Sequence, residues 1–271
     1  MVQARWALGI GLIVLVTGVP SVCAFAMDSR TIDGTNNNLQ NPDWGKAHTQ
    51  LLRQVPDDYE NGSWKPSGYN RPNVRDISNT VVAQDRPIFN EKSITDMVWQ
   101  WGQFLDHDLD LTESADPAEP FSIPIPSGDP HFDPFHTGNQ TMSLNRSMYD
   151  TATGTTQDNP RQQMNQITAY IDASMVYASD PIRAAALRTN DGTGRLKTSS
   201  GNLLPFNTFG LPNGGGSDPS FFLAGDVRAN EQVGLTAMHT LFVREHNRLA
   251  RIIKRRAPEL TDDQIYERAR A

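Results

Sequence analysis

The chain contains almost no cysteine and has a deficit of positive charge. Its 271 residues include one cysteine, Cys23, and carry a net charge of −7. A single thiol leaves no internal disulfide, so in an oxidising compartment stability must come from packing, a metal or a cofactor. Nucleic acid and anionic membranes both require a basic face. The acidic balance therefore argues against either as the main partner.

Long hydrophobic runs are missing beyond the first residues. The run 7–19 is nearly continuous and apolar, but it is too short for a comfortable transmembrane span. Arg5 precedes it, and Ala24-Phe25-Ala26 follows as a small-x-small cleavage site. The sequence therefore predicts a signal peptide over 1–26 and a secreted protein. Cys23 would leave with that peptide.

Several familiar catalytic patterns are also absent. The sequence has no CxxC pair, no HExxH and no internal repeat. Gly214-Gly215-Gly216 lacks the strand and helix that a phosphate-binding loop needs on either side. These absences exclude the common zinc-protease, dithiol and nucleotide-loop signatures.

Glycine and proline are plentiful, with 20 and 18 residues, and they predict long ordered loops. Residues 27–92 combine many of these breakers with dispersed aromatics, which indicates an extended arm that wraps a body. A helix is expected over 93–111, opened by an approximate capping box of Ser93 and Asp96. Residues 112–160 return to loop.

Helical signals dominate the remainder of the chain. A short helix is predicted over 181–189 and a long one over 231–255, with its basic end complementing the helix dipole. Thr261 and Gln264 form a capping box for one more helix. The chain stops within that helix, so we expect a mainly α domain that is incomplete at its C-terminus. Residues 93–271 would be its helical body.

The first segment with chemical content is 99–110, in which His107 stands between Asp106 and Asp108. Gln103, Asp106 and His107 fall on a face different from that of the apolar residues, because helical neighbours are three and four positions apart. A neutral imidazole in a closed pocket can move a proton between two oxygens of a substrate. The alternative is a capped histidine on a solvated acidic face.

The second segment is 168–174, where Thr168, Asp172 and Ser174 alternate with apolar residues. Calcium takes six to eight oxygen ligands, including carboxylates, hydroxyls and carbonyls. Asp108 could add a carboxylate from the first helix. The alternative is an ordinary half-buried strand that contains Thr and Ser.

The third segment is 223–232, just before the long helix. An arginine such as Arg228, aimed into a dry pocket, stabilises developing negative charge. Glu231 is expected in the first turn of the helix. The alternatives are a surface ion pair for Arg228 and plain dipole complementation for Glu231.

Together these segments resemble the animal-type haem peroxidases of the peroxidasin and myeloperoxidase group. The match runs in order from about residue 30 to the end. It includes Gln100-Trp101-Gly102-Gln103, Leu105 to Asp110, Asp172 to Tyr177, Leu204-Pro205-Phe206, Phe222 to Asp226, and Arg244 to Ala250. The resemblance implies a helical fold that holds haem b between helices, and a domain of which 27–271 is the N-terminal part.

The resemblance also implies roles for individual residues. His107 would be the distal acid-base, Arg228 would polarise the outgoing peroxide oxygen, and Gln103 would line the pocket. Two carboxylates would form ester links to haem, and five residues would bind a structural calcium ion. In this assignment the ester residues are Asp106 and Glu231, and the calcium ligands are Asp108, Thr168, Tyr170 through its carbonyl, Asp172 and Ser174.

Two departures from the family pattern limit this assignment. Gln232 stands where the myeloperoxidase branch has a methionine, so a sulfonium link is not expected. The other histidines are His48, His131, His136, His239 and His246, and none of them matches the family's proximal iron ligand. A missing C-terminal half would carry that ligand. The partners would be hydrogen peroxide and a small oxidisable donor, a halide or a phenol.

Two other readings stay open. One is a non-enzymatic, exported, calcium-binding remnant of a peroxidase domain. The other is a non-haem metal site on Asp106, His107 and Asp108, which is disfavoured because successive helical positions point in different directions.

Overall fold

A computed structural model describes residues 30–271; the predicted signal peptide lies outside the described residues. Its regular structure is mostly helical, in α1 (Val74–Val81), α2 (Met97–Asp106), α3 (Ser174–Tyr177), α4 (Pro181–Leu187), α5 (Val233–Arg256) and α6 (Asp262–Arg270), with a short 3₁₀ turn at Ser200–Asn202. The predominance of helix over strand confirms the predicted mainly α class, and long loops connect the helices as expected. No helix among the described residues is long and apolar enough to cross a membrane.

The strands are short and pair across long stretches of sequence. β1 (Thr49–Gln50) lies antiparallel to β4 (Met164–Asn165), with Thr49 opposite Asn165. β2 (Ile123–Pro124) lies antiparallel to β3 (Thr141–Met142). These two ribbons hold the loop-rich parts of the chain together.

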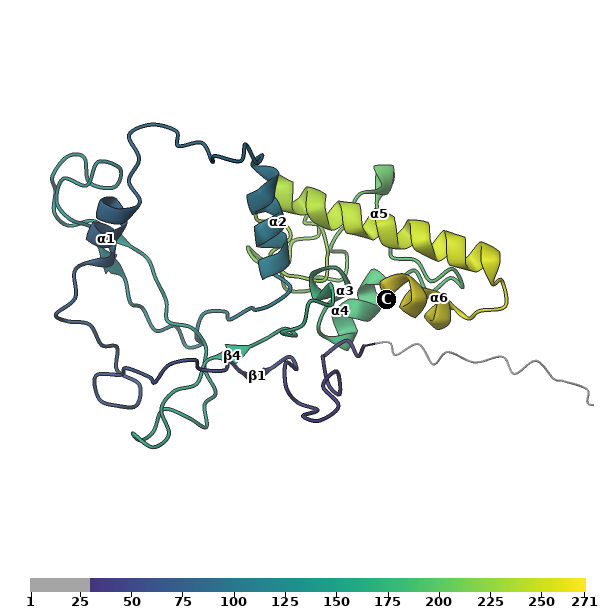
Figure 1. The fold of residues 1–271 in the computed structure, drawn as a ribbon, viewed down its shortest axis with the longest axis horizontal. Coiled ribbons are helices and arrows are strands. Elements are labelled where there is room, and N and C mark those ends of the chain that lie inside the picture. The colour runs from purple at the N-terminus through teal and green to yellow at the C-terminus, as the bar shows by residue number, and fades with distance from the viewer. Residues whose placement is uncertain (1–29) are drawn as a thin grey trace, which may run out of the picture.

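Helix α5 is the centre of the helical body. It packs against α2, α3 and α6, and Figure 1 shows it running across the top of the body with α2 at its N-terminal end. The core gathers where these helices meet and contains Phe104, Val176, Leu204, Leu223 and Leu235, each at most 2% exposed. The site residues are therefore carried by a packed core rather than by the loops on the left of Figure 1.

The segment predicted as a wrapping arm follows the body only in part. The amide of His48 donates to the carbonyl of Asn165, and the Arg270 guanidinium donates to the carbonyls of Arg30 and Thr31. The chain then leaves the body and forms a second lobe with the loop 112–160 (Figure 1). Helix α1 lies in that lobe. It was not predicted, and none of its residues is buried.

The first predicted helix is shorter at both ends than expected. α2 covers 97–106 rather than 93–111, and Ser93 makes no capping box because it has a φ of 52°. The amides of Asp108 and Leu109 donate to carbonyls three residues back, which tightens the chain into a turn after Asp106. His107 is therefore the C-cap residue of α2 and not a position inside the helix.

The other helices lie close to their predicted ranges. The helix expected at 181–189 ends at Leu187, and α5 begins at Val233 with Gln232 as its N-cap, so Glu231 precedes the helix and is not in its first turn. The capping box of α6 is confirmed. The Thr261 hydroxyl accepts from the Gln264 amide, and the Gln264 side chain accepts from the Thr261 amide.

Candidate active site

The turn that ends α2 sends three consecutive side chains in three directions. Asp106 is exposed, His107 is 4% exposed and Asp108 is fully buried. His107 lies beside Asp226, whereas Asp108 accepts from the Ser174 hydroxyl. The three side chains therefore do not converge on one ion, and the structure does not support the non-haem metal reading.

His107 is a buried imidazole whose Nδ1 has no hydrogen-bond partner among the described residues. The nearest carboxylate oxygen is Oδ1 of Asp226, 3.9 Å from Nδ1. Burial lowers the pKa of His107, and the positive charge of Arg228 lowers it further. The ring is therefore neutral near pH 7, which is the form that can accept a proton.

Arg228 is held by a buried carboxylate. Its Nε and Nη2 donate to the two oxygens of Asp226 at 2.9 and 2.8 Å, and Nη2 also donates to the carbonyl of Asp110. The Asp226 side chain is 1% exposed, and the guanidinium lowers the pKa of its carboxyl against the opposing effect of burial. Arg228 thus forms an ion pair, but its partner is buried, unlike in the surface ion pair that the alternative interpretation predicted.

Asp226 received no role from the sequence, although it lies in the third segment. It contacts both predicted reactive residues, His107 and Arg228. Gly225 places it there, since a Cβ at that position would overlap the backbone of α3. The Asp226 amide then donates to the carbonyl of Met175. An acidic residue two positions before the arginine was the available signal.

A surface hollow of about 660 Å³ lies between α2 and the residues just before α5, and neither His107 nor Arg228 is among its lining residues. Asp106 and Glu231, the two predicted ester carboxylates, both line it. Gln103 lies between them, and its Nε2 donates to Glu231 at 2.9 Å. Gln232 donates to the Gln103 oxygen at 3.1 Å. The predicted Gln103, Asp106 and Glu231 are thus brought to one wall, together with Gln232.

The predicted calcium ligands form a second cluster on the other side of the turn. Asp108 accepts from the Ser174 hydroxyl and the Ala173 amide at 2.8 and 2.9 Å. The Thr168 hydroxyl donates to Asp172 at 3.1 Å. Ala173 has a φ of 61°, a left-handed conformation that is costly outside glycine and marks functional turns. The segment forms a bend and not the half-buried strand of the alternative reading.

The electrostatics of this cluster favour a cation. Burial, and then the charge of Asp108, raise the pKa of Asp172 to about 6. Burial also raises the pKa of Asp108. Two buried carboxylates whose ionised forms are destabilised by burial, and in Asp172 also by a neighbouring charge, are the arrangement that a divalent cation relieves. The cluster has two acidic side chains. Within residues 30–271 no group of three or more His, Cys, Asp or Glu side chains is placed to hold a metal ion.

Tyr170 has a different position in the cluster from its neighbours. Its hydroxyl donates to the carbonyl of Trp44 at 2.5 Å, and its ring lies against Gly45. The ring thus anchors the first part of the arm. Within the described residues its carbonyl accepts no hydrogen bond, so the predicted ligand atom is available.

The chain belongs to the animal haem peroxidase family. The family model for animal haem peroxidase matches residues 29–271. A peroxidasin homologue from Mus musculus is 38% identical over 91% of the chain, and lactoperoxidase from Mesocricetus auratus is 33% identical over all of it. Peroxidase A from Dictyostelium discoideum is similar in structure, with a TM-score of 0.77 and 30% identity over 90% of the chain.

The relatives are longer than this chain. It spans 19% of the peroxidasin homologue, 42% of the lactoperoxidase and 50% of the Dictyostelium structure. A fatty acid alpha-dioxygenase from Arabidopsis thaliana shares the fold, with a TM-score of 0.70 at 21% identity. Fold and family are therefore shown, and the part of the domain held here is the one that carries the three segments.

Proposed function

We propose that this chain supplies the distal side of a haem b peroxidase, which reduces hydrogen peroxide and oxidises a small donor such as a halide or a phenol. One observation carries the proposal. The fold brings a buried His107 and Arg228 onto the same carboxylate, Asp226, while Asp106, which directly precedes His107, lines a hollow together with Glu231. Membership of the animal haem peroxidase family supports it.

The residues present fit haem. The hollow combines the Trp99 ring with two carboxylates and two amides, which suits a flat apolar group with polar edges. When bound, haem supplies the redox-active iron. Asp106 and Glu231 would hold it, through ester links in the proposed arrangement, and Gln103 would line its distal face.

His107 would act as the general acid–base. A neutral imidazole can take the proton from one oxygen of hydrogen peroxide and return it to the other oxygen as the O–O bond breaks. Arg228 would stabilise the negative charge that develops on the outgoing oxygen. Asp226 holds the guanidinium in place for this task.

Calcium would fix the turn that aims His107. The proposed ligands are Asp108, Thr168, Asp172, Ser174 and the carbonyl of Tyr170. Asp108 directly follows His107, so an ion bound there would restrain the backbone of the catalytic residue. Two buried carboxylates with raised pKa support this ion. Export of the protein rests on residues 1–26 and stays a prediction.

A second candidate function is a calcium-binding module without catalysis. The observation that favours it is that the calcium cluster is built from residues 108 and 168–174 alone, independently of the hollow. In this case calcium would stabilise the protein, but haem would not bind at the hollow.

The experiment that tests the proposal is guaiacol oxidation by the protein after hemin and imidazole are added, where imidazole takes the place of the proximal iron ligand; hemin with imidazole alone is the reference. We expect turnover with hydrogen peroxide, and a loss of about 10²-fold or more in His107→Gln, because general acid–base catalysis contributes that much. His131→Gln, at an exposed position, is the matched control and should keep the rate. A rate no higher than that of the reference would contradict the peroxidase proposal and favour the calcium-binding module.

A further inference from the structure

A second cleft lies away from the proposed haem site, between α5 and the segment 189–202. It has a volume of about 580 Å³. Four cationic side chains line it: Arg195 and Lys197 from the segment, and Arg244 and Arg251 from α5. Its other lining residues are neutral, so no carboxylate faces the space.

A smaller hollow of about 230 Å³ continues this cleft. Arg195 and Arg251 line both, and the smaller one adds Lys254 and Arg255. Positions 244, 251 and 255 fall on one face of α5, since seven and eleven residues make close to two and three turns. The six cations, which we call the basic strip, thus follow one side of the helix on a protein of net charge −7.

Most of the charge on the basic strip is not neutralised. Among the described residues, Arg195 has a carboxylate within 4 Å, that of Asp191 at 3.4 Å, and the other five cations of the strip have none. The Lys197 ammonium donates to the carbonyl of Ala186, and Arg251 donates to that of Asn247. Carbonyls orient these groups but carry no net charge, so the strip keeps a positive potential.

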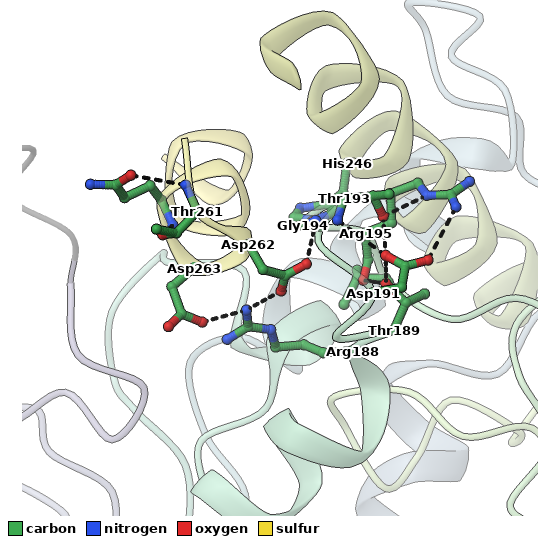
Figure 2. Close-up of polar contacts among 12 residues, drawn as sticks. Arg188, Thr189, Asp191, Thr193, Gly194, Arg195, His246, Thr261, Asp262 and Asp263 are labelled. Atoms are coloured by element: carbon green, nitrogen blue, oxygen red, sulfur yellow. Dashed lines mark hydrogen bonds and ion pairs between the residues drawn. The ribbon is translucent and has the colours of Figure 1, made fainter. Parts of the chain in front are cut away.

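The wall that carries Arg195 is pinned in place. Figure 2 shows the turn 189–195 held from both sides: the Gly194 carbonyl bonds to Nε2 of His246 at 2.9 Å, and its amide donates to Asp262 at 2.8 Å. Arg195 donates to the Thr193 hydroxyl. The Asn247 side chain then pairs with both the amide and the carbonyl of Leu196. A preorganised wall lowers the cost of ordering cations around a ligand.

Dipole complementation does not account for the whole basic strip. It explains Lys254 and Arg255, which lie in the last turn of α5. Arg244 lies in the middle of the helix, and Arg195 and Lys197 lie outside it. These three residues line the cleft without a role in the dipole.

We propose that the basic strip binds a ligand with two or more phosphate or sulfate groups. Guanidinium groups present paired donors that match such oxyanions, and three arginines of the strip lie on or beside the cleft floor. Two adjoining hollows that share Arg195 and Arg251 suit two linked oxyanion groups. This site is independent of haem and of the proposed peroxidase activity.

Isothermal titration at low ionic strength tests the proposal, with inorganic pyrophosphate and a trisulfated heparin disaccharide as probes. We expect saturable binding of at least one probe, and the better one identifies whether phosphate or sulfated sugar is the source. Arg244→Gln with Arg251→Gln should weaken binding by about tenfold, because two charge-assisted contacts are lost. The matched control removes the same charge at two exposed positions, Arg86→Gln with Lys92→Gln, and should bind like the wild type.

The proposal is overturned if neither probe binds saturably, or if the control loses as much affinity as the cleft variant. Arg244 also donates to the carbonyls of Gly201 and Asn202, so its loss could disturb the cleft. The single variant Arg251→Gln avoids this problem, since Arg251 is exposed and glutamine suits a helix. It should weaken binding by several-fold on its own, and unchanged affinity would equally contradict the site.

Discussion

At the scale of single residues, Asp226 organises the proposed catalytic pair. Its carboxylate accepts three hydrogen bonds from Arg228, one from the amide and two from the guanidinium, and lies 3.9 Å from His107 Nδ1. The sequence offers only a weak signal for this role, an acidic residue two positions before Arg228, because the contact with His107 and the burial against α3 arise from the fold. Gln103, Asp106 and Glu231 were easier to predict, since one helix end and one loop carry them.

Replacing Asp226 with asparagine should destabilise the protein by about 3 kcal/mol, because breaking a buried ion pair leaves the remaining charge uncompensated. Urea unfolding measures the change. Asp85→Asn, at an exposed position, serves as the control and should change stability by less than about 0.5 kcal/mol. Equal stability of the two variants would show that Asp226 does not hold Arg228.

Calcium should raise the melting temperature, and EDTA should lower it, because an ion would offset the charges of Asp108 and Asp172. Asp108→Asn should abolish this dependence on calcium. Asp191→Asn is a matched control, since Asp191 also accepts from two threonine hydroxyls but lies outside the cluster. An unchanged melt of the wild type in EDTA would count against the calcium site.

At the scale of elements, features set by local sequence signals could be predicted, whereas features set by tertiary contacts could not. The capping box of α6 and the extent of α5 follow from short-range patterns, and the structure has both. The end of α2 does not, because the turn at His107 depends on Asp108 reaching Ser174 from another segment. α1 was missed although Val74, Ile77 and Val81 recur at helical spacing, because the glycines and prolines of 27–92 favoured an extended arm.

His246 joins three elements and should make the fold sensitive to acid. It bonds to Tyr177 in α3 and to Gly194, and burial lowers its pKa to about 4. A folded-state pKa below the unfolded value of about 6.5 means full stabilisation above pH 6.5 and its loss as the pH falls toward 4. The melting temperature should therefore fall over this range.

His246→Gln should be less stable at pH 7 and should lose less on acidification, because a glutamine does not have to take up a proton. Thermal melts at pH 7 and at about pH 4.5, inside the window set by the two pKa values, measure this difference. His131→Gln, on the surface, should follow the wild type at both values. A parallel fall in all three proteins would contradict the role of His246.

At the scale of the whole molecule, the two proposed sites lie at different parts of α5. Glu231 and Gln232, just before α5, line the hollow, and α5 from Arg244 onward carries four of the six cations of the basic strip. The mainly α class and the family could be predicted from the sequence, because several motifs occur in the right order. The basic strip could not, since Arg195 and Lys197 join the α5 cations only through the fold.

The central claim is that the fold presents a haem-binding wall at Asp106 and Glu231, and a hemin titration followed by the Soret band tests it most directly. We predict saturable binding to the wild-type chain and clearly weaker binding to Asp106→Asn with Glu231→Gln. The control Asp85→Asn with Glu91→Gln removes the same charge at exposed positions and should bind like the wild type. A Soret band that never saturates, or one that the two double variants change equally, would contradict the claim.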